Sequence, residues 1–180
     1  MRIEKEESAG LVIDIQERLF PHMDQHALLL ENMLVLLKGL AALEVPVLLT
    51  EQYPKGLGPT LEEIRQSPGI PVPIIKGAFS CCDEPAFRMT LEQTARRKVI
   101  ICGIEAHVCV LQTVIDLLEY GYVPVVVADC ISSRKAGDKE LALERMRTEG
   151  AVVTSMESIL FELARVSGTE EFKTISRLVK

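Results

Sequence analysis

The sequence lacks the features that mark membrane and secreted proteins. No apolar run reaches the ~18 residues that a membrane-spanning helix needs. The N-terminal stretch MRIEKEES is charged and has no apolar core of the kind found in signal peptides. We therefore expect a cytoplasmic protein with no membrane partner.

Basic clusters and nucleotide-binding motifs are also scarce. The net charge is −6, and the one short basic cluster is ARRK at residues 95–98, so no nucleic-acid partner is expected. No GxGxxG motif follows the first predicted strand, where the sequence reads DIQERL. This absence argues against a dinucleotide-binding Rossmann domain, and no cofactor is predicted.

Cysteine spacing argues against disulfide and zinc frameworks. The five cysteines are an odd number and show no CxxC or other metal-ligand spacing, so we expect five free thiols. Cys102 and Cys130 fall inside apolar runs, where packing is the expected role. Cys81 and Cys82 fall in a loop after Lys76, where they could line the mouth of a site, and they receive no assigned role.

The features that are present predict an α/β fold. Short, nearly continuous apolar runs rich in Val and Ile predict strands buried on both faces, as in a parallel sheet. These runs are residues 9–14, 45–50, 70–76, 98–104, 122–130 and 151–154. Apolar residues recur at helical spacing between them, at Leu29, Met33, Leu36, Leu37 and Leu40 and again at Val108, Leu111, Ile115 and Leu118. Further helices are expected at 138–149, 156–166 and 170–179.

This alternation predicts a single domain over residues 1–180, a three-layer α/β/α, doubly wound, six-stranded parallel sheet. The longest irregular stretch is about 51–69, where Pro and Gly cluster around one short possible helix, and long loops often carry function. Ligands of such sheets bind beyond the carboxyl ends of the strands. Three reactive side chains are expected there: Asp14, Lys76 and Cys109.

Each of these three residues has a catalytic and an ordinary interpretation. Cys109 follows the fourth strand at a helix start. In the catalytic interpretation, the helix dipole and a nearby lysine lower the thiol pKa and favour the thiolate. In the ordinary interpretation, Cys109 is a buried packing residue. Asp14 is either a catalytic base or the N-cap of the following helix or turn. Lys76 either holds the thiolate by its charge or extends its ammonium group into water. The trio together favours nucleophilic catalysis.

The three histidines are weaker candidates. His107 lies two residues from Cys109, and at a helix start such side chains point in different directions, so we expect a capping or pocket-wall role. His22 and His26 have no third ligand nearby and are expected to be solvated.

Four motifs give the chain a specific resemblance. They are LVIDIQERLF, IIKGAFS with its strand-end lysine, GIEAHVCV and VVVADCISSR, in this order over about 150 residues. The chain resembles the isochorismatase-like (Rossmann-like) hydrolase superfamily, also called cysteine hydrolases. The stretch TEQYPKGLGPT makes it most similar to the subgroup of isochorismatase domain-containing proteins.

The resemblance implies a catalytic triad of Asp14, Lys76 and Cys109. It also implies a cis peptide bond between Ile104 and Glu105, with an oxyanion hole made by the backbone N–H groups of Glu105 and Cys109. The implied reaction is acyl transfer through a Cys109 thioester, with Asp14 as base and Lys76 as electrostatic partner.

The substrate pocket and the assembly are further expectations. Gln16, Phe20, Tyr53 and Phe79 are expected to line the pocket for a small-molecule substrate. Nicotinamidases carry an Asp-x-His metal motif where this chain reads TEQYPKGLG without histidine, so we expect no catalytic metal. True isochorismatases lack the nucleophilic cysteine, so the presence of Cys109 argues against isochorismatase activity. The resemblance also implies a homo-oligomer, a dimer or tetramer.

Two functions follow as alternatives. The first is a metal-independent cysteine hydrolase acting on a small amide, carbamoyl or related C–N bond. The second is a non-catalytic small-molecule binding module, or a redox-sensitive interaction module, on the same fold.

Overall fold

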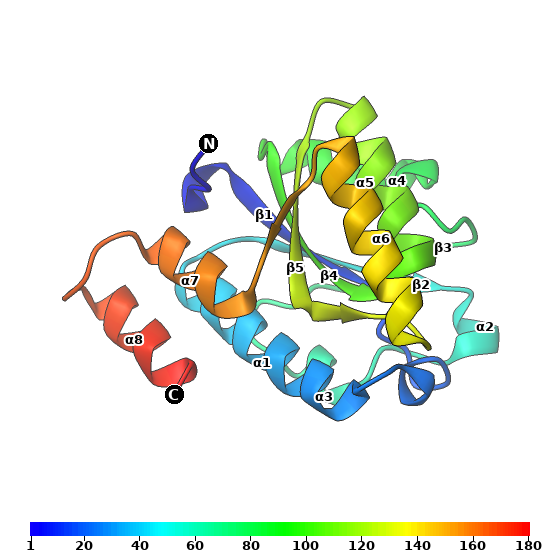
Figure 1. Ribbon diagram of the computed structural model, residues 1–180, viewed down its shortest axis with the longest axis horizontal. Coiled ribbons are helices and arrows are strands. Elements are labelled where there is room, and N and C mark those ends of the chain that lie inside the picture. Colours follow the sequence, from blue (N-terminus) through cyan, green and yellow to red (C-terminus); the bar gives the residue numbers. More distant parts are fainter.

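The computed structural model describes all 180 residues and contains one six-stranded sheet (Figure 1). The strands lie in the order β3-β2-β1-β4-β5-β6, and every neighbouring pair is parallel. Their bounds are β1 Ser8–Ile13, β2 Val47–Gln52, β3 Ile74–Lys76, β4 Lys98–Ile104, β5 Val123–Ser132 and β6 Val152–Thr154. The predicted doubly wound parallel α/β fold is confirmed.

Helices cover both faces of the sheet (Figure 1). One side carries α1 (His26–Ala42), α7 (Met156–Ala164) and α8 (Glu170–Leu178), and the other carries α4 (Pro85–Gln93), α5 (Leu111–Glu119) and α6 (Ala136–Glu149). Each helical layer packs its own apolar cluster against the central strands, which explains why those strands are apolar on both faces. No helix combines the length and the apolarity needed to cross a membrane.

Two predicted elements differ from the structure for local reasons. The third strand is limited to Ile74–Lys76 rather than 70–76, because Pro71 and Pro73 cannot donate ladder hydrogen bonds. The stretch 51–69 holds two short helices rather than one, α2 (Pro54–Leu57) and α3 (Glu62–Arg65), and its first two residues belong to β2.

The buried face of α5 also differs from the prediction. The buried apolar residues are Leu111, Val114 and Leu117, whereas Ile115 and Leu118 are only half-buried. Val108, Ile115 and Leu118 still pack against the apolar cluster that α5 covers, and a π-helical turn, Ala106–Val110, precedes this helix.

The centre of the sheet lies between β1 and β4, where the strand order reverses. Here Gly103 of β4 pairs with Ile13 of β1 and has a φ of +134°. A Cβ atom at position 103 would lie 2.8 Å from Ile13 Cα and closer still to the Ile13 carbonyl oxygen. Only glycine therefore allows the two strands to approach this closely.

Replacement of this glycine tests the constraint. Gly103→Ala is expected to lower the free energy of unfolding by at least about 3 kcal/mol, because backbone atoms must move and the φ is unfavourable for alanine. Urea unfolding followed by circular dichroism measures the loss. The matched control is Gly137→Ala in α6, where an added Cβ meets nothing within 4 Å; it should leave stability unchanged or raise it. Equal stability of the two variants would contradict the close-approach argument.

Candidate active site

Four polar side chains converge at the carboxyl edge of the sheet, at the point where the strand order reverses. Asp14 follows β1, Gln52 ends β2, Lys76 ends β3, and Cys109 lies in the π turn that follows β4. Because parallel strands end at the same edge, side chains separated by up to 95 residues in sequence become neighbours. The structure thus brings together the three residues predicted from the strand ends and adds Gln52.

A buried ion pair forms the base of the site. Lys76 Nζ lies 2.7 Å from Asp14 Oδ2, and both side chains are buried. Thr50 Oγ1 donates to Asp14 Oδ1 at 2.8 Å, and Lys76 Nζ donates to the carbonyl oxygens of Ala78 and Phe79 at 3.1 and 3.0 Å. Asp14 Oδ2 faces the Lys76 ammonium, and the charge of Asp14 also acts on the neighbouring Cys109 thiol, whose pKa it raises.

Lys76 keeps its positive charge in this buried position. Burial favours the neutral amine, but the charge of Asp14, followed by the neighbouring thiols Cys81 and Cys109, acts in the opposite direction, and the net effect raises the Lys76 pKa. A buried ammonium is stable only when it is paired and hydrogen-bonded, and the contacts with Asp14, Ala78 and Phe79 meet that requirement.

Gln52 connects the candidate nucleophile to the ion pair. Cys109 Sγ donates to Gln52 Oε1 at 3.1 Å, and the same oxygen lies 3.4 Å from Lys76 Nζ. The sequence-based predictions do not include Gln52, although they name the adjacent Tyr53 as a pocket residue. The position of Gln52 as a polar residue that ends a buried strand, like Lys76, is the signal that would have found it.

The Cys109 thiol is protonated at rest, which contradicts the predicted lowering of its pKa. Burial is the main cause and the charge of Asp14 the next, and Lys76 offsets only part of their effect, so the Cys109 pKa rises to about 12. The side chain sits in the core with 5% of its surface exposed. A nucleophilic role therefore requires a base that removes the thiol proton as the reaction proceeds.

The predicted pocket residues have different environments. Gln16 is buried, and its amide bonds the Gln52 backbone N–H and carbonyl and the Gly58 carbonyl, so it positions Gln52 and has no free donor for a ligand. Phe20 is also buried, packed in the apolar cluster under α1 and edge-on to His26. Its helical turn directs the ring into the core, and a pocket role for Phe20 stays a prediction.

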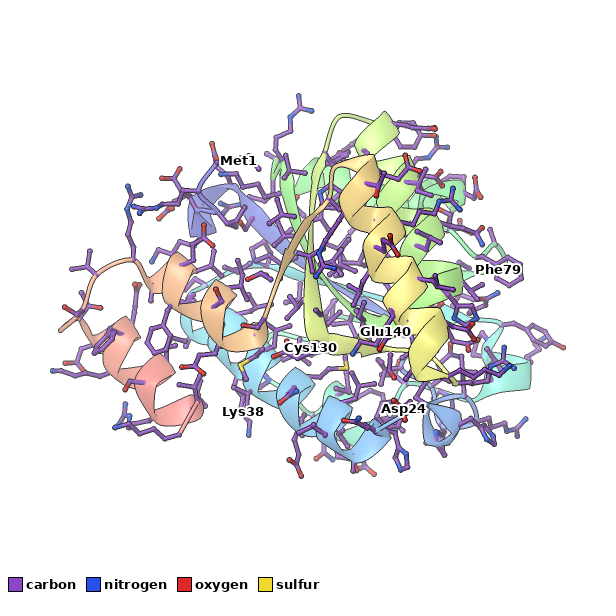
Figure 2. The ribbon with its side chains drawn as sticks, viewed as in Figure 1. Met1, Asp24, Lys38, Phe79, Cys130 and Glu140 are labelled. Carbon is purple, nitrogen blue, oxygen red and sulfur yellow. The ribbon has the colours of Figure 1, made fainter.

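Tyr53 and Phe79 lie on the exposed rim of the site. Tyr53 follows β2 and is 63% exposed, and Phe79 is 53% exposed. Figure 2 shows Phe79 at the right-hand edge of the molecule, far from the sheet interior. Both backbones touch the site through Lys76, since Tyr53 N donates to the Lys76 carbonyl and the Phe79 carbonyl accepts from Lys76 Nζ.

The turn after β4 holds Cys109 in place. The peptide bond between Ile104 and Glu105 is cis, as the family resemblance implied. The Glu105 N–H donates to no acceptor within the chain, and the Glu105 carboxylate is held by Arg134 at 2.8 Å. The buried Thr113 hydroxyl donates to the Cys109 carbonyl at 2.7 Å and accepts from the Cys81 N–H at 2.9 Å.

All five cysteines are free and buried, as the spacing predicted. Cys102 and Cys130 pack in the same apolar cluster, and Figure 2 shows Cys130 between the sheet and α1. Cys81 lies 3.9 Å from Thr50 Oγ1, which places this thiol beside the ion pair. Burial raises the Cys81 pKa to about 11.

His107 makes its contacts away from the thiol of Cys109. Its Nδ1 lies 2.9 Å from Ser133 Oγ, and its Nε2 lies 4.0 Å from Asp138 Oδ2. This pairing fits the expected wall role better than a Cys–His nucleophile pair. No group of three or more His, Cys, Asp or Glu side chains is arranged to hold a metal ion.

Comparison with known proteins identifies close relatives. Residues 8–158 match the model of the isochorismatase domain family. Isochorismatase domain-containing protein 2A of Mus musculus is 38% identical over 180 residues, covering 99% of this chain and 85% of that protein. The secreted isochorismatase effector Isc1 of Phytophthora sojae is 45% identical over 143 residues, 77% of this chain and 68% of its own length.

Solved structures of similar proteins share the fold. The structure of MAR1 ribonuclease from Caenorhabditis elegans has a TM-score of 0.92 and 36% identity, covering 99% of this chain and 92% of that one. The structure of YcaC from Pseudomonas aeruginosa, with hexane-2,5-diol and covalent acrylamide, has a TM-score of 0.86 and 26% identity, covering 97% and 89% of the two chains.

The charges around Cys109 predict how its alkylation depends on pH. Iodoacetamide should modify wild-type Cys109 slowly near neutral pH, with a rate that still rises above about pH 9, because burial and Asp14 raise its pKa to about 12. Asp14→Asn removes the negative charge that raises the Cys109 pKa, so this pKa falls and alkylation at about pH 9 accelerates, roughly tenfold for each unit of pKa change.

Peptide mass spectrometry over a pH series measures these rates. Cys102 is the internal control, because burial alone raises its pKa; its modification should stay slow in both proteins, which also reports that the fold is intact. An Asp14→Asn protein with unchanged or slower Cys109 alkylation would show that Asp14 does not govern the charge of this thiol.

Proposed function

Because the chain belongs to the isochorismatase family, which supports a hydrolase role, we propose that it is a metal-independent cysteine hydrolase cleaving a small amide, carbamoyl or related C–N bond. The observation that carries this proposal is the buried Asp14–Lys76 ion pair, together with the Cys109 thiol held by Gln52. A carboxylate base, a fixed positive charge and a thiol are the parts that acyl transfer to cysteine needs.

The first half-reaction forms a thioester. Asp14 Oδ2 takes the Cys109 proton as Sγ attacks the substrate carbonyl carbon, giving a tetrahedral oxyanion. When the C–N bond breaks, the amine leaves with the proton held by Asp14, and the acyl group stays on Sγ. Lys76 stabilises the negative charge of the developing thiolate. This charge is otherwise unfavourable, because burial and Asp14 raise the Cys109 pKa.

The second half-reaction hydrolyses the thioester. Asp14 takes a proton from water as the oxygen attacks the acyl carbon. The C–S bond then breaks, Asp14 returns its proton to Cys109 Sγ, and the carboxylic or carbamic acid departs. We assign the oxyanion hole to the backbone N–H groups of Glu105 and Cys109. The Glu105 N–H supports this role because it has no acceptor within the chain.

The closed surroundings of the site favour a small substrate. Asp14 and Lys76 are buried and Cys109 is 5% exposed, so a ligand enters past the exposed rings of Tyr53 and Phe79. Gln52 Nε2 has no partner in the chain, and we assign it to the carbonyl or carbamoyl group of the substrate. Gln16 supports this assignment by fixing the Gln52 backbone from behind.

Two relatives suggest probes for the proposal. The Pseudomonas YcaC structure holds covalent acrylamide, so acrylamide is a suitable electrophile for Cys109 of this chain. The Caenorhabditis relative is called a ribonuclease. The net charge of −6 and the small, buried site do not favour RNA as the substrate here, and an RNA arm in the activity screen addresses that possibility directly.

The second candidate function is a non-catalytic binding module. The raised pKa of Cys109 favours it, since the thiol carries no standing negative charge and is not pre-activated. A cytoplasmic location and a homo-oligomer of two or four copies remain predictions from sequence; light scattering of the purified protein tests the second.

Turnover by matched variants distinguishes the two functions. Small primary amides, N-carbamoyl compounds and a structured RNA are incubated with wild type, Cys109→Ser and Cys102→Ser. Wild type and Cys102→Ser should release ammonia or amine from at least one small substrate, and Cys109→Ser should lose at least about a thousandfold in kcat, as expected for loss of a nucleophile.

Trapping of the intermediate gives a second readout. Acid quenching during turnover should leave an acyl group on the Cys109 peptide, detected by its mass. If Cys109→Ser retains full activity, or if wild type binds small amides but turns over none of the classes tested, the hydrolase proposal fails and the binding module is favoured.

A further inference from the structure

A second concave site lies in the helical layer, away from the candidate active site. A cavity of about 670 Å³ is bordered mainly by α4, α5 and the segments that follow each of them. Neither Asp14, Gln52, Lys76 nor Cys109 lines it. Its volume falls within the range of about 300–1,000 Å³ that is typical of sites for small organic molecules.

The lining of this cavity combines an apolar base with positive charge. Phe87, Leu91 and Leu117 are buried apolar members of the lining, and Met89 and Tyr120 are exposed ones. Three arginines also line it, at positions 88, 96 and 97, against a single carboxylate, Glu92. This excess of positive charge stands out on a chain whose net charge is −6.

None of the three arginines is neutralised by an ion pair. The arginine ion pairs of the chain involve Arg134, Arg145 and Arg165. Arg88 instead lies over the Tyr120 ring, 5.8 Å from its centroid, and Arg96 donates to the Lys5 carbonyl at 3.3 Å. Guanidinium groups without a carboxylate partner are suited to bind an external anion, with planar, two-pronged geometry.

From these observations we propose that the cavity between α4 and α5 binds a small organic anion with an aromatic body. The anionic group meets Arg88 and Arg97, and the ring system packs on the exposed side chains of Met89 and Tyr120. A second copy of the chain fits less well, because two concave surfaces are not complementary about a two-fold axis and such a contact would bring like charges together. The proposal does not depend on the hydrolase function of the other site.

Three probes separate the contributions of charge and aromatic body. 1-Anilinonaphthalene-8-sulfonate carries both, N-phenyl-1-naphthylamine carries the same ring system without the charge, and inorganic phosphate carries charge alone. Fluorescence titration of the full chain should give one sulfonate site per chain. The neutral amine should bind at least tenfold more weakly, and phosphate at equal concentration should not displace the sulfonate.

Variants locate the probe. The double variant Arg88→Gln/Arg97→Gln should weaken sulfonate binding at least tenfold and leave the neutral amine unaffected. Arg145→Gln on α6 is the matched charge control and should bind like wild type. Cys109→Ser should also bind like wild type, which separates this cavity from the candidate active site. Circular dichroism of each variant confirms that the probe reports a folded chain.

Three outcomes would overturn the proposal. The first is the absence of saturable sulfonate binding to wild type. The second is equal binding by the double glutamine variant and wild type. The third is a wild-type dimer that is converted to monomers by Met89→Glu, with the probe binding only the monomer; that result would assign the face to a second copy of the chain.

Discussion

The buried Asp14–Lys76 ion pair is the interaction on which the organisation of this protein depends. Two charges removed from water are stable only if their remaining donors and acceptors are also satisfied. Thr50 supplies a donor to Asp14, and the carbonyl groups of Ala78 and Phe79 supply acceptors to Lys76. The pair therefore requires the ends of β1, β2 and β3 and the loop after β3 to be placed together.

The same pair explains why a candidate nucleophile rests as a neutral thiol. Burial and the carboxylate of Asp14 both disfavour a thiolate at Cys109, and Lys76 compensates only in part. The geometry is nevertheless suited to catalysis, because the group that disfavours the thiolate is also the group that can accept its proton. Once Asp14 is protonated, the unopposed charge of Lys76 favours the thiolate.

Contacts between distant segments place the residues around this centre. The Gln16 amide binds the Gln52 backbone, and Gln52 Oε1 then contacts both Cys109 and Lys76. The Thr113 hydroxyl links the Cys109 carbonyl to the Cys81 backbone. Each of these contacts joins two elements, so replacing one partner displaces groups that are far away in sequence.

The sequence by itself determined the layers of the fold and pointed to the candidate site. Apolar runs of strand length and helical spacing are local properties, and they predicted six parallel strands and the helices between them. The rule that ligands bind beyond strand ends then selected Asp14, Lys76 and Cys109. Only the tertiary structure decided the contact of Gln52 with the thiol, the burial of Phe20, the buried face of α5 and the direction of the Cys109 pKa shift. Each of these depends on which distant groups become neighbours, and a pattern along one segment does not contain that information.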